Sequence, residues 1–224
     1  MKKRQEFYDG IKTGSPIAIG YNPIAIAFGA LAIEAQMSVK ESLAMSVFVF
    51  AGASQFVAAG MILTNASAIQ ITITTLFVNL RHLIMSMVIN EKYNHFPLSS
   101  KIGLSFGITD ETFALLTLKS EGEEGEITPP FAAGLMSIAY LGWVSGTALG
   151  SLSAQIIPSQ ISAGMTMGLY AMFIGLLVPH IRQSIKIGVI AILSMMLNTI
   201  FQTFLESGWA IILAIIIGAF LGTF

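Results

Sequence analysis

The chain has 224 residues, of which 54% are hydrophobic and only 10% are charged, and its mean hydropathy is +0.78. Because soluble domains carry roughly a quarter charged residues, this composition is typical of an integral membrane protein embedded in a lipid bilayer. The formal net charge of −1 does not indicate nucleic-acid binding, and the absence of cysteine excludes disulfides, thiolate zinc ligands and thiol catalysis.

Apolar runs long enough to cross a bilayer recur along the whole chain. A transmembrane helix needs about 20 such residues, and counting the runs predicts an all-α integral membrane protein, a polytopic bundle of about seven or eight helices with six as the lower bound. The predicted spans are 14–33, 43–63, 68–89, 102–118, 130–151, 161–181, 186–204 and 208–224. The basic first residues resemble the start of a signal peptide, but no clear cleavage site follows, so we interpret the first run as a retained span.

The first two predicted spans should be broken near the midplane of the membrane. Pro23 is the tenth residue of 14–33, and Gly52 is the tenth residue of 43–63. Proline removes a helix donor, and a glycine-rich segment lets a helix unwind. Non-helical backbone at that depth is tolerated only inside the protein or along a watery cavity, so we expect the neighbouring Ser54 and Gln55 to contact a solute.

Ionisable residues lie inside the third and fourth predicted spans, where a charge costs a few kcal/mol and should be paired. Arg81 lies eight residues before the end of the third span, and Asp110 lies eight residues after the start of the fourth. If the two spans form a hairpin, both residues lie about 12 Å from the same surface. Arg81 should therefore pair with Asp110 or Glu111, and with Asn79 and His82 these residues are candidates for a substrate or proton pathway.

One carboxylate is left over once Arg81 is neutralised. In a site of low dielectric constant, the spare group should bind a proton reversibly or meet the ammonium group of a substrate. Exposed half-helix N-termini at the same depth would attract a carboxylate. A structural reading stays open beside this one, in which the pair of Arg81 only links two helices and His82 only packs.

Glycines at four-residue spacing predict faces of close helix packing. They are Gly142, Gly146 and Gly150, then Gly164 and Gly168, and finally Gly218 and Gly222. The segment 127–131, which follows the acidic loop 121–126, loosely resembles the segment 12–16 before the first span. We therefore expect one transporter domain over 1–224 that contains a two-fold repeat with halves 10–118 and 128–224.

Lysine and arginine near the ends of the spans indicate a cytoplasmic N-terminus. The residues expected on that side are Lys2, Lys3, Arg4, Lys12, Lys119, Arg182 and Lys186, and those expected on the opposite side are Lys40, Lys92 and Lys101. A re-entrant segment would reverse the placement of the loop 90–101.

Three segments resemble the characteristic motifs of the AzlC/YgaZ family, the large subunits of bacterial branched-chain amino acid exporters. They are FAGASQF at 50–56, NLRH at 79–82 and TDETFA at 109–114. The opening segment 20–29 departs from the family pattern at Ile24, where an aromatic residue is expected. The resemblance implies export of Leu, Ile, Val and similar side chains such as Met across the cytoplasmic (inner) membrane. It also implies assembly with a small membrane subunit of the AzlD/YgaH type.

The sequence therefore predicts a gradient-driven secondary transporter that is not an enzyme and uses no cofactor; it contains no Walker A motif for ATP. One alternative is a passive channel or a structural subunit whose partner carries the transport chemistry. Another is an intramembrane enzyme that uses His82 with a carboxylate as an acid–base pair. The lack of a Gly-x-Ser-x-Gly motif and of metal-binding histidine pairs argues against that enzyme.

Overall fold

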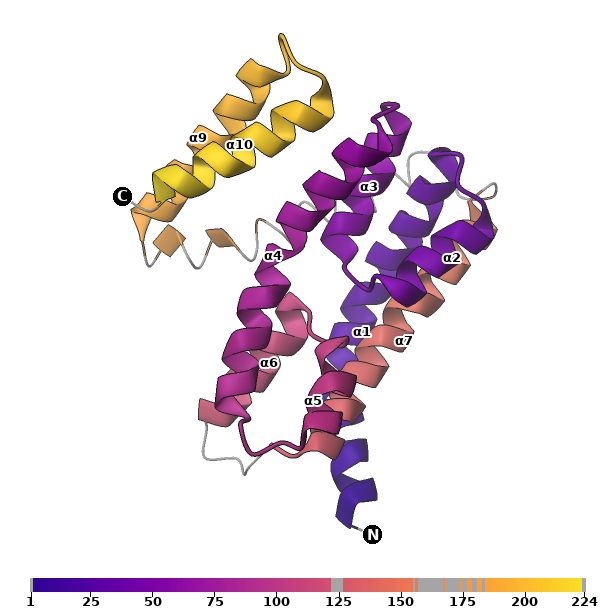
Figure 1. Cartoon of the computed structure of the whole chain (residues 1–224). Helices are drawn as coiled ribbons and strands as arrows, with labels where there is room; N and C mark the ends of the chain where they lie inside the picture. Colours follow the sequence, from indigo (N-terminus) through magenta and orange to yellow (C-terminus); the bar gives the residue numbers. More distant parts are fainter. Residues whose placement is uncertain are drawn as a thin grey trace.

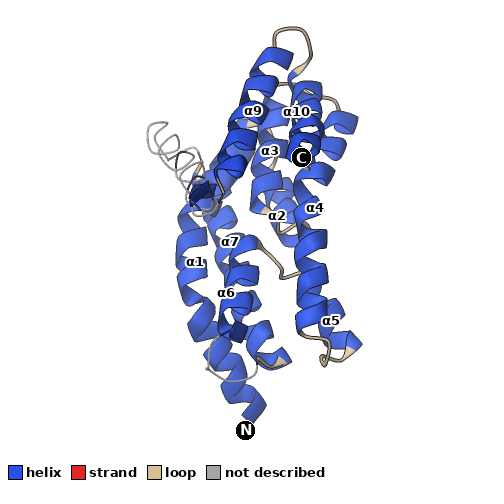
Figure 2. Cartoon of the chain, turned by 90° about the vertical axis from the view of Figure 1, so that its left-hand side faces the viewer, coloured by secondary structure: helices blue, strands red, loops and turns tan. Residues whose placement is uncertain are grey.

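The computed structural model of the chain describes residues 2–121, 127–154 and 184–222, with a few single positions between 156 and 182. Every regular element in these residues is a helix (Figure 2). The helices are α1 (Lys2–Glu34), α2 (Val39–Phe48), α3 (Gly52–Leu63), α4 (Ala68–Lys92), α5 (Leu98–Ser105), α6 (Asp110–Glu121), α7 (Pro129–Ser153), α9 (Ile185–Phe201) and α10 (Ser207–Gly222). Most of the predicted span 161–181, the Gly164 and Gly168 pair and the loop 122–126 lie outside the described residues.

Three helices, α1, α4 and α7, are long and apolar enough to cross a membrane. Helices α1 and α7 lie side by side and run in the same direction, because Ala18 faces Gly142 near their middles and Ile26 faces Gly150 two turns further on. Helix α4 runs the opposite way (Figure 1). By length and composition, these three helices agree with the predicted spans 14–33, 68–89 and 130–151.

The contact between α1 and α7 is made largely through glycine. The predicted packing face of α7 is confirmed, since Gly142, Gly146 and Gly150 all abut the backbone of α1, and α1 contributes Gly29 in return. Lipid tails are as apolar as leucine, so helices in a membrane associate through close van der Waals contact, which small residues permit. A side chain at any of these glycines would separate the two helices.

Helices α2 and α3 form a hairpin that enters from one end of the bundle and turns back at its middle. At the turn, the Phe50 ring packs against Tyr21 of α1 at 6.4 Å between ring centroids, and further along α3, Phe56 packs against Phe28 at 5.6 Å. Helix α3 therefore returns toward the end at which α1 finishes. The predicted break beside Gly52 is confirmed, but the segment 43–63 does not cross the bundle as predicted.

Helices α5 and α6 form a second hairpin that enters from the opposite end. Near the start of α5, the Lys101 ammonium donates to Asn90 Oδ1 at 2.9 Å, close to the end of α4. At the turn, the Phe106 ring reaches Phe50 of the first hairpin, with the centroids 6.2 Å apart. Helix α6 then leads back, so that Tyr93 donates to the Leu116 carbonyl at 2.7 Å. The predicted span 102–118 is therefore also a re-entrant pair of short helices.

Two expectations need correction. Helix α1 is continuous through Pro23, although an interior proline removes a hydrogen bond and costs about 3 kcal/mol in a soluble helix. It stays helical because it packs against α7 along its length, and because a break would leave further backbone groups unpaired where water is absent.

The second correction concerns the lysines. Since the 102–118 segment turns back, Lys92 and Lys101 lie at the same end as the N-terminus, together with Lys119 (Figure 1).

The order of elements repeats within the first six helices. A long helix followed by a re-entrant hairpin, α1–α2–α3, is followed by the same order in the opposite direction, α4–α5–α6 (Figure 1). This repeat differs from the expected halves 10–118 and 128–224, and because the second half is only partly described, those halves stay a prediction. Helices α9 and α10, at the predicted spans 186–204 and 208–224, pack on each other, and α10 also packs against α4.

The glycine contact can be tested within a single helix. A Cβ atom at Gly29 would lie 2.5 Å from the Thr147 carbonyl oxygen, whereas a Cβ atom at Gly20 would meet nothing within 4 Å. We expect Gly29→Ala to lower the free energy of unfolding by about 1–3 kcal/mol through overpacking. Gly20→Ala should leave it unchanged or raise it by up to about 1 kcal/mol. Thermal unfolding of both variants in detergent checks this, and equal melting temperatures would contradict the packing described here.

Candidate functional site

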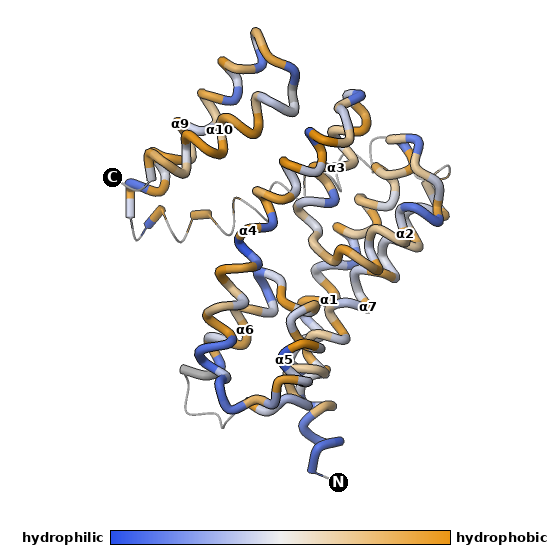
Figure 3. Tube along the Cα trace, in the orientation of Figure 1, coloured by the Kyte–Doolittle hydropathy of each residue, from blue (hydrophilic) through white to orange (hydrophobic). Residues whose placement is uncertain are grey.

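A small cavity of about 30 Å³ lies where the two hairpin turns meet the three long helices. Every long helix and both hairpins contribute to its wall. The lining residues are Tyr21 of α1, Phe50 to Ala53 at the first turn, Arg81 and His82 of α4, Thr109, Asp110 and Glu111 at the second turn, and Trp143 of α7. Figure 3 shows a hydrophilic segment midway along α4, the helix that contributes Arg81 and His82 to the cavity.

The cavity brings together Gly52, Arg81, His82, Asp110 and Glu111 from the residues predicted as a pathway. Their convergence follows from the topology: both hairpins turn at mid-depth, and the middle of α4 lies at the same level. The depth match between Arg81 and Asp110 holds as predicted, but a re-entrant helix produces it instead of a crossing one.

Arg81 pairs with Asp110. The Arg81 Nη1 atom lies 2.6 Å from Asp110 Oδ2, and the two side chains are 32% and 26% exposed. The sequence left open whether Arg81 pairs with Asp110 or with Glu111, and in the structure it pairs with Asp110. The pair joins the middle of α4 to the first turn of α6, where an acidic residue also complements the positive end of the helix dipole.

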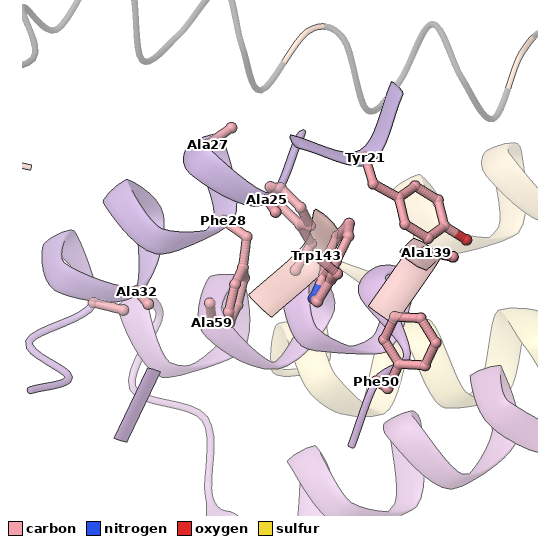
Figure 4. Packing of buried hydrophobic residues seen from close by; sticks show 11 residues of the cluster. Tyr21, Ala25, Ala27, Phe28, Ala32, Phe50, Ala59, Ala139 and Trp143 are labelled. Atoms are coloured by element: carbon pink, nitrogen blue, oxygen red, sulfur yellow. The ribbon is translucent and has the colours of Figure 1, made fainter. Parts of the chain in front are cut away.

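Glu111 is the carboxylate left over. It accepts a hydrogen bond from the Tyr21 hydroxyl, which also lies 2.8 Å from the Thr109 hydroxyl. Tyr21 is only 6% exposed, and its ring lies near Phe50 and Trp143, which also line the cavity (Figure 4). The Tyr21 hydroxyl that bonds Glu111 is neutral, so the negative charge of Glu111 stays available to a cation or a proton.

His82 presents one ring nitrogen to the backbone and leaves the other without a partner. The Ile108 carbonyl can only accept, so the proton between them, across 3.0 Å, sits on His82 Nδ1. His82 Nε2 and Arg81 Nε are buried and have no hydrogen-bond partner among the described residues. An unpaired buried polar atom costs about 1–3 kcal/mol, so these two atoms mark a position where a polar solute or water would be stabilised.

The N-terminus of α3 opens onto the cavity without a side-chain cap. Helices α2 and α4 are capped by Ser38 and Ser67, but the residue that precedes α3 is Ala51, which offers no side-chain acceptor. The free N–H groups of Gly52 and Ala53 therefore face the cavity at the positive end of the helix dipole. Such an end binds carboxylates and other anions.

Glycine is required at position 52 because of Trp143. A Cβ atom there would lie 2.6 Å from the Trp143 ring, which is 3% exposed and packs against Tyr21 and Phe28 (Figure 4). The indole thus seats the first turn of α3 against α7. It also forms one wall of the cavity.

A buried polar chain holds Trp143 in place. Trp143 Nε1 donates to Gln55 Oε1 at 2.9 Å, Gln55 Nε2 donates to Ser46 Oγ at 2.9 Å, and the Ser46 and Thr147 hydroxyls lie 2.7 Å apart. Gln55, Ser46 and Thr147 are fully buried. Gln55 therefore links α2, α3 and α7 and does not line the cavity.

The remaining predicted residues also lie away from the cavity. Ser54 is 1% exposed and donates to the Ala51 carbonyl at 2.9 Å. Pro23 borders a separate groove between α1 and α7. Asn79 Oδ1 is buried with no partner among the described residues, one turn before His82.

Sequence reasoning missed Tyr21, Thr109 and Trp143 as lining residues. Tyr21 and Trp143 are polar-tipped aromatic residues of two apolar helices, and such a residue needs a hydrogen-bond partner when it is buried, which was the available signal. Nothing in the sequence showed that α1 and α7 are neighbours. Their convergence depends on the glycine contact.

The role of Gln55 is testable by substitution. Gln55→Met keeps the length of the side chain but leaves the Trp143 N–H without its acceptor, so we expect the protein to lose about 1–3 kcal/mol of stability. Ser54→Ala, its sequence neighbour, removes one hydroxyl whose bond is local and should cost less. Thermal unfolding in detergent measures both. A Gln55→Met protein that melts like the unsubstituted one would show that the buried chain is not structural.

Comparison with known proteins places this chain in a family. The profile described as AzlC protein matches residues 16–157. An uncharacterized membrane protein of Archaeoglobus fulgidus is 34% identical over 206 residues, which cover 88% of this chain and 89% of that protein. The inner membrane protein YgaZ of Escherichia coli is 32% identical over 148 residues, covering 66% of this chain and 60% of YgaZ.

A further relative carries a functional name. The branched-chain amino acid transport protein AzlC of Bacillus subtilis is 27% identical over 181 residues, covering 78% of this chain and 69% of that protein. No solved structure matches the chain. The matched residues include both hairpins and all the long helices except the start of α1. The chain is a membrane protein with several spanning helices, and it belongs to the AzlC family.

Proposed function

We propose that the protein is a gradient-driven secondary transporter that exports branched-chain and similar hydrophobic amino acids. The observation that carries the proposal is the chemistry of the cavity: an uncapped helix N-terminus and a carboxylate that Arg81 does not neutralise line the same small space. These two groups complement the two charges of an amino acid zwitterion. The name of the Bacillus subtilis relative, a branched-chain amino acid transport protein, supports the substrate class.

Each end of the zwitterion has its own partners. The substrate carboxylate accepts from the free N–H groups of Gly52 and Ala53, with the unpaired Arg81 Nε as a further donor. The substrate ammonium meets Glu111, in place of the Tyr21 hydroxyl. Half-helix termini that bind a substrate at mid-depth are a recurring arrangement in transporters built on broken helices.

The present conformation is closed around this site. A volume of about 30 Å³ is the share of a single water molecule in the liquid, far below what an amino acid needs. Binding therefore requires the hairpin turns to separate. The turns are the only non-helical backbone at this depth among the described residues, so they are the places where the chain can bend with the smallest loss of hydrogen bonds.

The proposed orientation puts the N-terminus in the cytoplasm. Lys92, Lys101 and Lys119 lie at the same end as the basic N-terminal residues, whereas Lys40 lies at the other end (Figure 1). An excess of lysine and arginine marks the cytoplasmic side. The printed name of YgaZ supports a location in the inner membrane. We further propose, from the family resemblance, that a small AzlD/YgaH-type subunit completes the transporter.

The central test is efflux of labelled leucine from proteoliposomes, with and without the small subunit and with and without a pH gradient. Glu111→Gln should reduce gradient-driven efflux by about ten- to a hundredfold, the equivalent of one charged hydrogen bond of 1.5–3 kcal/mol. Glu41→Gln is the matched control, because Glu41 is exposed in the capping box of α2 and glutamine can serve there too. No efflux from unsubstituted protein under any gradient would assign it a structural role.

The Arg81 and Asp110 pair yields a separate prediction. Arg81→Ala leaves the Asp110 carboxylate without its partner and should cost about 1–3 kcal/mol, whereas the double change of Arg81→Ala with Asp110→Ala should recover most of that loss. Melting temperatures of the two single variants and the double variant measure the coupling. A double variant that is stable yet inactive in efflux indicates that the pair acts on the solute. A stable and active one would reduce the pair to a structural link.

A further inference from the structure

A second, much larger cavity opens at the end of the bundle that carries the N-terminus. Its volume is about 900 Å³, and it lies between the start of α1, α5 and the first half of α7. Charged side chains, Lys2, Lys3 and Glu6, stand at one side of it, at the start of α1. We call this cavity the vestibule.

The inner end of the vestibule is apolar and stops at an aromatic cluster. Its wall there includes Leu104, Met136, Phe106 and Tyr140. The Phe106 and Tyr140 rings lie 5.8 Å apart, and Phe50 closes the cluster, 5.1 Å from Tyr140 and 6.2 Å from Phe106 between centroids. One ring comes from each hairpin turn and one from α7.

The same cluster borders the polar cavity. Phe50 lines the cavity that contains Glu111 and Arg81, while Phe106 and Tyr140 line the vestibule. Three side chains in mutual contact therefore stand between the two spaces. Tyr140 is held in place, since its hydroxyl donates to the Val47 carbonyl at 3.0 Å, so the two phenylalanines on the turns are the parts that can move.

The backbone of the first turn is strained, and the second turn packs closely on α7. Phe50 has a φ of 39°, a region that side chains other than glycine rarely adopt, and residues held there are concentrated in ligand clamps and switch segments. Gly107 lets the other turn lie directly on Met136, where a Cβ atom would be 2.7 Å from the Met136 sulfur. Phe50 thus stands on strained backbone, whereas Phe106 has the ordinary helical backbone angles φ −66° and ψ −27°.

We propose that the vestibule is a second binding site for the transported amino acid, on the N-terminal side, and that Phe50, Phe106 and Tyr140 form the barrier between it and the polar cavity. The proposal rests on the proposed function. The vestibule lies within the size range of small-ligand sites, about 300–1,000 Å³, whereas the polar cavity holds only a water. The alkyl side chain contacts Leu104, Met136 and Phe106, and the charged groups of the zwitterion point toward the mouth.

The chain contains no cysteine, so single cysteines can be introduced without a prior background change. Ser137→Cys lies on the vestibule wall, and Ser145→Cys is the matched control, eight residues further along α7 in the separate groove beside Pro23. A charged methanethiosulfonate reagent is added from the side at which Lys3→Cys reacts. Leucine should slow the labelling of Ser137→Cys several-fold and leave Ser145→Cys unchanged.

The barrier is tested without any solute. Ala53→Cys lies in the polar cavity and should react slowly from the N-terminal side. Adding Phe106→Ala should speed that reaction by about tenfold or more, because the open state becomes more populated. Phe106→Leu, which keeps most of the apolar bulk, should have a smaller effect.

The outcomes separate this proposal from the function on which it rests. Unchanged labelling of Ala53→Cys in the Phe106→Ala protein overturns the barrier even if leucine efflux is observed. Leucine efflux without protection of Ser137→Cys overturns the vestibule as a binding site. Reaction of Ser137→Cys with a lipid-soluble maleimide but not with the charged reagent assigns the vestibule to lipid and also overturns it. A working barrier without leucine efflux under any gradient counts against the proposed function, and against the amino acid as the ligand of the vestibule.

Discussion

The parallel contact of α1 with α7 supports everything else at the centre of this molecule. It brings Tyr21 and Trp143, from opposite parts of the chain, to the same depth. The two helices touch backbone to backbone because glycines occupy the contact, and no hydrophobic driving force in the membrane could substitute for that closeness. Once the pair is formed, it provides a rigid wall on which both hairpins rest.

Hairpins that end in the middle of a membrane need compensation for their exposed backbone. The first hairpin obtains it from a chain of buried side-chain hydrogen bonds, in which Gln55 joins Trp143 to Ser46. The second obtains it from Thr112, whose hydroxyl donates to the Gly107 carbonyl at 2.9 Å and accepts from the Thr109 N–H. What stays uncompensated is the N-terminus of α3, and it faces the polar cavity. The unpaired N–H groups of this helix end thus lie where a solute could satisfy them.

Much of this arrangement could be predicted from the sequence, and particular residues show where the prediction ends. Arg81, Asp110 and Glu111 stood out because charges inside apolar spans need partners, and the structure places them in one cavity. The break at Gly52 was also foreseen. The predicted helix break at Pro23 was wrong, because the packing of α1 against α7 outweighs the loss of one backbone hydrogen bond. The re-entrant course of 43–63 and 102–118 could not be predicted, since a span and a hairpin of the same length have the same hydropathy.

The lining residues that the sequence did not reveal share one property. Tyr21 and Trp143 contribute through contacts between helices far apart in the chain, and hydropathy within one helix carries no information about such contacts. Gln55 was interpreted as a solute ligand because it lies beside a break. Its two hydrogen bonds, at 2.9 Å each, instead fix the hairpin to α7. Proximity to an irregular segment is therefore weaker evidence for a binding role than convergence of several elements.

The opposite directions of the two helix–hairpin units have a consequence for how the proposed transporter could open alternately at the two ends of the bundle. Units with the same order of elements need not adopt the same conformation, and here they differ: the vestibule lies beside α5 of the second unit. If the two units exchanged conformations, the vestibule beside α5 would close and an equivalent one would open beside α2, at the other end of the bundle. Two states that open toward opposite ends of the bundle would then follow from the opposite directions of the two units.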